Sequence, residues 1–239
     1  MCRGSFQNAT CVTLHRIFAM LQPFLYILNA QRNILASGSP RRKEILENVG
    51  LKFEVIPSTF EENLDKSQFT PQEYVVETAK LKTSEVAERL SQTGPLPDLI
   101  IGCDTVVYQN NQIIEKPRDK ADAVRILTKL SGRSHSVFSG LTLFVPASSD
   151  VLKDGCPVVD SKFRCASFVE QTEVFMCEMS SEVIDAYIAT GEPMDKAGGY
   201  GIQALGGTLV NKIHGDNFNV MGFPLPRFAR EMSRIYSKK

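Results

Sequence analysis

Residues 34–49 read Ile-Leu-Ala-Ser-Gly-Ser-Pro-Arg-Arg-Lys-Glu-Ile-Leu-Glu-Asn-Val, and they predict how the folded part of the chain begins. The apolar run 34–36 is typical of a short buried strand, and the small residues 37–39 then predict a tight turn. Pro40 stands where a helix would begin, because its fixed φ suits the first helical position. Apolar residues recur at helical spacing up to Val49. The stretch therefore predicts a strand, a turn and a helix in immediate succession.

This corner has the local chemistry of an anion site. A strand that leads through small residues into a helix N-terminus leaves backbone N–H groups pointing outward, and the helix dipole favours an anion there. Arg41 and Arg42 add two guanidinium groups whose geometry suits phosphate oxygens. The corner is not a Walker loop, however, and its glycine content is low. Two solvated arginines on an ordinary strand–turn–helix corner are the alternative, and local chemistry leaves both interpretations open.

Composition excludes several classes of function. The chain has 239 residues, with 27 Lys and Arg and 27 Asp and Glu, so its formal net charge is zero. We therefore expect no overall electrostatic attraction to a nucleic acid polymer or an anionic membrane. No apolar run is long enough to cross a bilayer. The six cysteines show no C-x-x-C pair and no metal-ligand spacing, which favours free thiols in a reducing compartment. Any anion binding must come from a local group of side chains.

The amino-terminal segment differs in composition from the rest. We expect residues 1–31 to form an N-terminal extension, flexible or targeting, and residues 32–239 to form one folded domain. No acidic residue precedes Glu44, and scattered arginines among Phe, Leu and Ser resemble a transit peptide. Mitochondrial targeting is therefore one interpretation. The others are a translation start at Met20 and a frayed extension. We expect a cytoplasmic protein, with mitochondrial localisation as the alternative.

Two later stretches predict where further functional groups lie. Thr70-Pro71-Gln72-Glu73 has the form of a capping box and predicts a helix running to about Leu90. Residues 99–101 predict an apolar strand that ends in Asp104, before a turn at Asn110-Asn111. A carboxylate at the end of a central strand is well placed to hold a metal or activate water. The alternative is an aspartate bonded to nearby backbone N–H groups.

The second half of the chain predicts a mixture of strands, helices and a glycine-rich loop. Residues 163–176 alternate over two strand lengths, residues 219–223 predict a loop, and residues 226–236 predict a final helix. Residues 192–207 contain five glycines, which indicates backbone held close to another group. Two histidines, His135 and His214, are candidates for catalysis, but both are interpreted as structural.

Charged residues of both signs lie on these loops. The acidic candidates are Asp104 and Glu62, and the basic ones are Arg41, Arg42, Lys82, Lys116 and Lys196. Both signs together would suit a polyphosphate carried with a divalent cation. Each charge taken alone is more typical of a solvated surface residue. Cys103 is discounted as a nucleophile, because its acidic neighbour disfavours the thiolate.

Five motifs, in order, resemble those of a known family. They are Ala36-Ser-Gly-Ser-Pro-Arg-Arg42, Gly102-Cys-Asp-Thr105, Glu115-Lys-Pro117, Ser131-Gly-Arg-Ser-His135 and Asp195-Lys-Ala-Gly-Gly-Tyr-Gly-Ile-Gln203. This set is similar to that of the Maf family of nucleoside triphosphate pyrophosphatases, and the resemblance extends over roughly 33–236. It implies an α/β fold similar to that of inosine triphosphate pyrophosphatases, with a mixed twisted sheet, flanking helices and two lobes about a central cleft. It also implies hydrolysis of a nucleoside triphosphate to the monophosphate and pyrophosphate with a divalent cation, Mg²⁺ or Mn²⁺.

The resemblance assigns roles residue by residue. Asp104 matches the family's proton acceptor, and Glu62 matches an acidic position near the metal, so both are expected as metal ligands. The phosphate-side positions are Ser37, Arg41, Arg42, Lys82 and Lys116, and we expect Lys196 of the glycine-rich stretch to join them. Arg41, Thr105 and Gln203 match the three positions that separate subfamilies, and they are like those of the branch acting on dTTP and UTP. Thr and Gln side chains can both donate and accept hydrogen bonds, which suits the O4, N3–H and O2 edge of a pyrimidine base.

These observations predict an enzyme acting on dTTP, UTP and modified pyrimidine triphosphates. One alternative is a nucleotide-binding regulator of cell division with little turnover, and another is a pyrophosphatase for purine or methylated nucleotides. The expected partner is the nucleotide, with neither a nucleic acid polymer nor a membrane. A homodimer is a further expectation.

Overall fold

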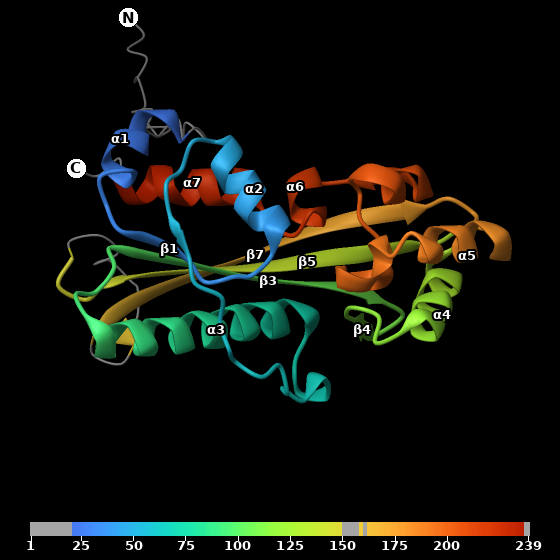
Figure 1. Ribbon diagram of the computed structural model, residues 1–239, viewed down its shortest axis with the longest axis horizontal. Coiled ribbons are helices and arrows are strands. Elements are labelled where there is room, and N and C mark those ends of the chain that lie inside the picture. Colours follow the sequence, from blue (N-terminus) through green and yellow to red (C-terminus); the bar gives the residue numbers. More distant parts are fainter. Residues whose placement is uncertain (1–20, 150–157, 160–161, 237–239) are drawn as a thin grey trace, which may run out of the picture.

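The computed structural model describes residues 21–149, 158–159 and 162–236 (Figure 1). Its strands are β1 (Asn33–Leu35), β2 (Glu54–Val55), β3 (Leu99–Gln109), β4 (Gln112–Ile114), β5 (Ser134–Pro146), β6 (Val158–Val159), β7 (Phe163–Met176) and β8 (Val210–His214). Its α-helices are α1 (Leu25–Leu28), α2 (Pro40–Asn48), α3 (Pro71–Thr93), α4 (Lys120–Leu130), α5 (Ser181–Ala189), α6 (Asn217–Val220) and α7 (Leu225–Tyr236). Short 3-10 segments are η1 (Gln22–Phe24), η2 (Lys66–Gln68), η3 (Glu192–Asp195), η4 (Ala197–Gly199) and η5 (Ala204–Leu209).

One mixed sheet runs through the molecule. Within the described residues its eight strands have the order β2-β1-β3-β5-β7-β6, with β4 paired to β3 and β8 to β7. The short β1 pairs in parallel with β2 and β3, whereas β3, β5 and β7 form long antiparallel pairs. Figure 1 shows these three strands running along most of the length of the molecule. The predicted mixed α/β fold with flanking helices is confirmed.

Helix α3 covers one face of the sheet at very close range. Thr70 accepts from the backbone of Glu73, and the Glu73 side chain accepts from the backbone of Thr70, so the predicted capping box is present. A Cβ added at Gly140 would lie 2.3 Å from the carbonyl oxygen of Val75, and one at Gly102 would overlap the hydroxyl of Thr83. Only glycine lets the helix axis approach the centre of the sheet this closely.

The opposite face is covered by α1, α2 and α7 (Figure 1). Their buried side chains pack with those of β1, β3 and β5 in one apolar cluster. A separate apolar cluster joins α4, α5 and the glycine-rich segment to the far ends of the long strands. These two clusters lie towards opposite ends of the long strands, and two further apolar clusters lie between α3 and the sheet. Within the described residues no helix is both long and apolar enough to span a membrane.

The folded unit starts earlier than the predicted boundary at residue 32. Leu21 and Leu28 are buried in the core beside α7, and the amide of Asn29 donates to the carbonyl of Gly50. The hydroxyl of Tyr236 donates to Gln31. Residues 21–31 therefore belong to the domain rather than to a flexible extension, and the remainder of the predicted extension, 1–20, lies outside the described residues.

Three other elements differ from the sequence-based expectation. Residues 163–176 form one continuous strand, because β5 pairs with β7 along its entire length from Ser134 to Pro146. The expected loop 219–223 begins inside the short helix α6, which Asp216 caps through its side chain. The strand expected to end at Asp104 continues to Gln109, since β5 also supports β3 beyond that point.

Candidate active site

The candidate site lies where β1 stops and β3 continues. β1 pairs with β3 only from Asn33 to Leu35, opposite residues 99–101, and β4 takes up the same edge of β3 at Val107. Between these two pairings, no strand formed by the described residues pairs with this edge of β3. A cavity of about 550 Å³ opens at this gap, a size typical of small-molecule sites.

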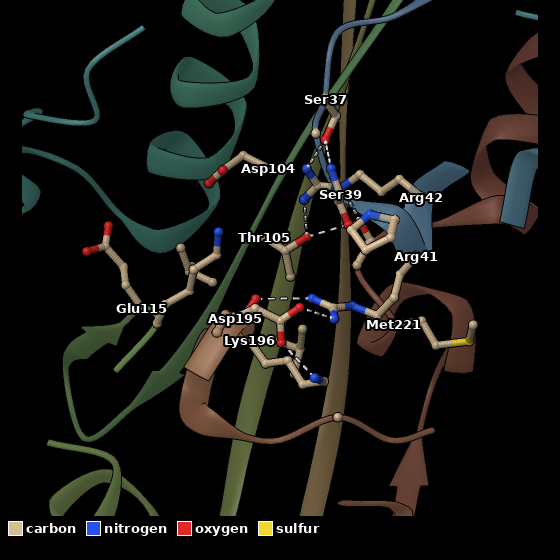
Figure 2. A pocket seen from close by; sticks show the side chains of 18 of the residues that line it. Ser37, Ser39, Arg41, Arg42, Asp104, Thr105, Glu115, Asp195, Lys196 and Met221 are labelled. Carbon is tan, nitrogen blue, oxygen red and sulfur yellow. Dashed lines mark hydrogen bonds and ion pairs between the residues drawn. The ribbon is translucent and has the colours of Figure 1, made fainter. Parts of the chain in front are cut away.

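The structure brings all the sequence-predicted site residues to this one cavity. Its lining includes Ser37, Arg41, Arg42, Glu62, Lys82, Asp104, Thr105, Lys116, Lys196 and Gln203. They come from the turn after β1 and the start of α2, from α3 and the loop before it, from β3 and the β4–α4 loop, and from the glycine-rich segment. Figure 2 shows the two arginines, Asp104 and Thr105 around the same hollow. Their individual roles stay predictions.

Asp104 and Thr105 reach the cavity from opposite faces of the sheet. Successive side chains of a strand alternate, so Asp104 points to the α3 face and Thr105 to the α2 face (Figure 2). The Nζ of Lys82, on α3, lies 2.7 Å from a carboxylate oxygen of Asp104 and also 2.7 Å from one of Glu62. Side chains from both faces can line one cavity because no strand covers this edge of β3.

Asp104 is a buried carboxyl whose environment favours a base. Its side chain is 8% exposed, against 45% for that of Glu62. Burial raises the pKa of Asp104, although the positive charges of Lys82 and Arg42 act in the opposite direction. A carboxylate with a raised pKa binds a proton more strongly than a solvated one, which is what a general base requires.

Arg42 is clamped on the α2 side of the cavity. Its Nε donates to the carbonyl of Gly222 at 2.8 Å, Nη1 to the hydroxyl of Ser37 at 2.9 Å, and Nη2 to the hydroxyl of Thr105 at 3.2 Å. A guanidinium has five N–H donors, so two remain for a ligand. Arg42 is thus a fixed donor rather than a solvated side chain.

The Thr105 hydroxyl is already fully used by the protein. Besides Arg42, it bonds to the hydroxyl of Ser139 at 2.8 Å and to the carbonyl of Gly222 at 3.2 Å. A hydroxyl offers one donor and two acceptor sites, so these partners occupy its capacity. In this arrangement Thr105 supports Arg42, whereas sequence reasoning expected its hydroxyl to face a pyrimidine.

The remaining predicted residues differ in how they are held. The Nζ of Lys196 lies 2.6 Å from the carbonyl of Glu192 and 2.7 Å from a carboxylate oxygen of Asp195. Within the part of the chain that the structure describes, the side chains of Lys116 and Gln203 have no hydrogen-bond partner. These two are therefore free to meet a ligand.

Sequence reasoning missed Glu115 and Asp195 as lining residues. The hydroxyl of Tyr74 donates to Glu115 at 2.8 Å, and Lys66 pairs with it at 2.6 Å. The pKa of Tyr74 is raised well above its ordinary value, chiefly by burial and secondly by the hydrogen bond to Glu115. Both acids stand inside the quoted motifs, directly before Lys116 and Lys196, so motif membership was the available signal.

Two residues discounted from the sequence, His135 and Cys103, are buried. The Nε2 of His135 lies 2.6 Å from the hydroxyl of Tyr200, and burial lowers the pKa of His135 to about 4. Cys103 is buried, and its burial raises the pKa of the thiol, so the nucleophilic thiolate is disfavoured.

A cleft that gathers fixed arginines, lysines and two carboxylates in a mixed α/β fold defines a site for a polyphosphate. The family model described as Maf-like protein matches residues 32–235, and this chain belongs to that family. The resemblance inferred from the five motifs is thereby confirmed.

Named relatives cover most of this chain. A human protein called probable bifunctional dTTP/UTP pyrophosphatase/methyltransferase protein is 50% identical over 91% of this chain, which spans only 34% of that relative's length. The dTTP/UTP pyrophosphatase of Clostridium perfringens is 41% identical over 83% of this chain and 94% of its own length. The dTTP/UTP pyrophosphatase of Bacillus cytotoxicus is 40% identical over 85% of this chain and 95% of its own length.

Proposed function

We propose that this chain hydrolyses dTTP and UTP to the nucleoside monophosphate and pyrophosphate. The observation that carries the proposal is the gathering of Asp104, Lys82, Arg41 and Arg42 at one cavity, in a chain 40% or more identical to proteins named for that activity. The methyltransferase part of the human relative's name is not transferred, because this chain spans about a third of that protein.

The reaction is an attack of water on the α-phosphorus. The water oxygen bonds to phosphorus, the bond from phosphorus to the α–β bridging oxygen breaks, and pyrophosphate leaves with that oxygen. Asp104 takes the proton that the water loses, and its burial supports this role by raising its pKa. The two unused donors of Arg42 and the ammonium of Lys116 stabilise charge on the phosphate oxygens.

The carboxylates also suit a divalent cation. Glu62 and Asp104 converge on one point, which the ammonium of Lys82 occupies at 2.7 Å from each. In the described residues no three His, Cys, Asp or Glu side chains converge as a metal site. Mg²⁺ and Mn²⁺ accept oxygen ligands, and Mg²⁺ is commonly held by one or two carboxylates plus substrate phosphates. Glu62 and Asp104 would hold such a cation, which when bound neutralises phosphate charge.

Gln203 is the candidate base reader. Its amide is half-buried on the cavity wall with both donor and acceptor unused by the described protein. Uracil and thymine present two carbonyl acceptors and one N–H donor, so an amide can pair with them. A site built on such bonds rejects a base that leaves them unpaired.

The test is pyrophosphate release from a nucleotide panel with Mg²⁺ or Mn²⁺. We expect release from dTTP and UTP by the wild type, and a loss of about 10²-fold or more in kcat for Asp104→Asn. Glu54→Gln is the matched control, because Glu54 forms a 3.0 Å arginine pair with Arg32 outside the cavity. Equal rates for Asp104→Asn and wild type would remove Asp104 from the mechanism. Tight nucleotide binding without release would favour the regulatory alternative.

Cytoplasmic localisation and homodimer formation stay predictions. Imaging of the tagged full-length chain tests the first, and sedimentation of the purified protein tests the second.

A further inference from the structure

The ammonium of Lys82 bridges the two acids that suit a divalent cation. Its Nζ lies 2.7 Å from Oε1 of Glu62 and 2.7 Å from Oδ1 of Asp104. In the part of the chain that the structure describes, no further His, Cys, Asp or Glu joins this pair of acids to complete a metal site. One positive group of the protein therefore already uses the oxygens that a cation would need.

The fold fixes the two acids, whereas the lysine can move. Asp104 lies in the middle of β3, which β5 supports on both sides of this position. The loop that carries Glu62 is tied to α3, where a side-chain oxygen of Glu85 accepts from the backbone N–H of Thr59 at 2.9 Å. The charge of Lys82 stands at the end of a flexible four-carbon stem. A change of partners at this point is therefore a movement of the lysine.

The ammonium and a divalent cation compete for the same oxygens. The side chains of Lys82 and Asp104 are only 14% and 8% exposed, so water screens charges here weakly. Two positive groups placed beside the same acids would repel each other at short range. An ammonium that left this place without a new partner would be a poorly solvated, unpaired charge. In the substrate-free protein Lys82 thus opposes the binding of a cation.

A triphosphate supplies the new partner that the lysine needs. Lys82 lines the same cavity as Arg42 and Lys116, which present positive charge to a bound phosphate group. Phosphate oxygens accept charge-assisted hydrogen bonds from an ammonium. They also complete the coordination of a cation that a protein holds by only one or two carboxylates. Movement of one side chain would therefore make nucleotide and cation favour each other's binding.

We propose that Lys82 keeps divalent cations off Glu62 and Asp104 until a nucleotide binds, and that it then transfers to the phosphates. The inference rests on the proposed function, and it adds a second role to the phosphate contact that the family resemblance implies for Lys82. Its consequence is that Asp104 meets a cation only when substrate is in place.

The first test is the affinity of the substrate-free protein for Mn²⁺ at pH 8, measured from the paramagnetic resonance signal of the free ion. Lys82→Met should bind Mn²⁺ about tenfold more tightly than wild type, because the competing charge is gone. Lys116→Met is the matched control, since it removes a lysine of the same cavity that has no hydrogen-bond partner among the described residues. Its Mn²⁺ affinity should stay close to that of wild type. Lys82→Met combined with Glu62→Gln should lose the gain.

The second test repeats the titration with a dTTP analogue that carries a methylene group between the α- and β-phosphorus. The protein is kept in excess, so that all of the analogue is bound. The analogue should tighten Mn²⁺ binding in wild type. This tightening should be about tenfold smaller in Lys82→Met, since no lysine has to leave the acids in that variant.

The outcomes separate this inference from the proposed function. If wild type releases no pyrophosphate, the proposed function fails, and the substrate-free titrations still test Lys82. Equal Mn²⁺ affinities of substrate-free wild type and Lys82→Met overturn the inference. It is also overturned if Lys116→Met binds Mn²⁺ as tightly as Lys82→Met, or if the gain survives Glu62→Gln. Thermal melting checks that each variant folds, and Lys82→Gln, whose amide can still donate to Asp104, replaces Lys82→Met if that variant does not.

Discussion

Lowering the pH from 7.5 to 5 is expected to destabilise the folded protein through His135. The residue is 4% exposed, and burial lowers its pKa from 6.5 to about 4 in the folded state. Between these two values the unfolded chain binds a proton that the folded chain does not. The contribution of neutral His135 to the free energy of unfolding is therefore fully present above pH 6.5. It is lost as the pH falls towards 4, and it changes little below that.

The magnitude follows from the gap between the two pKa values. A gap of about 2.5 units at roughly 1.4 kcal/mol per unit gives a total loss of about 3.5 kcal/mol, of which about 2 kcal/mol is lost by pH 5. Such a loss is a large fraction of the stability of an ordinary domain. It also bears on the candidate site, because Tyr200, the partner of His135, lines the cavity.

Urea unfolding at a series of pH values measures this loss. The comparison is wild type against His135→Gln, which keeps a hydrogen-bonding group for Tyr200 but does not titrate. Subtracting the two pH profiles removes the contribution of the carboxylates that both proteins share. The variant should show a free energy of unfolding that falls less between pH 7.5 and 5, by about 2 kcal/mol. Parallel profiles would refute the account of a buried neutral histidine.

Two further predictions concern packing and the arginine clamp. Gly140→Ala should lower the free energy of unfolding by about 1–3 kcal/mol, because its Cβ would meet the carbonyl of Val75, whereas Gly94→Ala, with nothing within 4 Å, should be nearly neutral in urea unfolding. Thr105→Val should lower kcat/KM about tenfold for every nucleotide alike through the loss of the bond to Arg42, and Thr105→Ser should retain activity. A selective loss for one base in Thr105→Val would instead make Thr105 a base reader.

The local elements could be predicted from the sequence because local interactions specify them. Pro40 does begin α2, the capping box at Thr70 does begin α3, and Asn110-Asn111 does form a turn, with φ values of 49° and 58°. Each of these signals acts within a few residues. The gathering of the site residues also followed from sequence, but through the family motifs rather than through local chemistry.

Features that depend on distant partners could not be predicted. The continuation of β3 past Asp104 depends on pairing with β5, and the uninterrupted β7 depends on the same strand. The local pattern of apolar residues predicts neither of these strand pairings. The saturation of the Thr105 hydroxyl depends on Ser139 and Gly222, which are 34 and 117 positions away.

The position of the site follows from these long-range pairings. Had β3 ended at Asp104, its carboxylate would lie at the end of a strand rather than in the middle of one. Because β3 continues and β1 stops instead, Asp104 remains held opposite Gly140, its register partner, while one edge of its strand is open. Gly140 has no side chain, so α3 lies close enough for Lys82 to reach Asp104. A rigid strand thus presents a buried acid to one face and the arginine clamp to the other, which is the arrangement that a water-activating base facing a fixed phosphate requires.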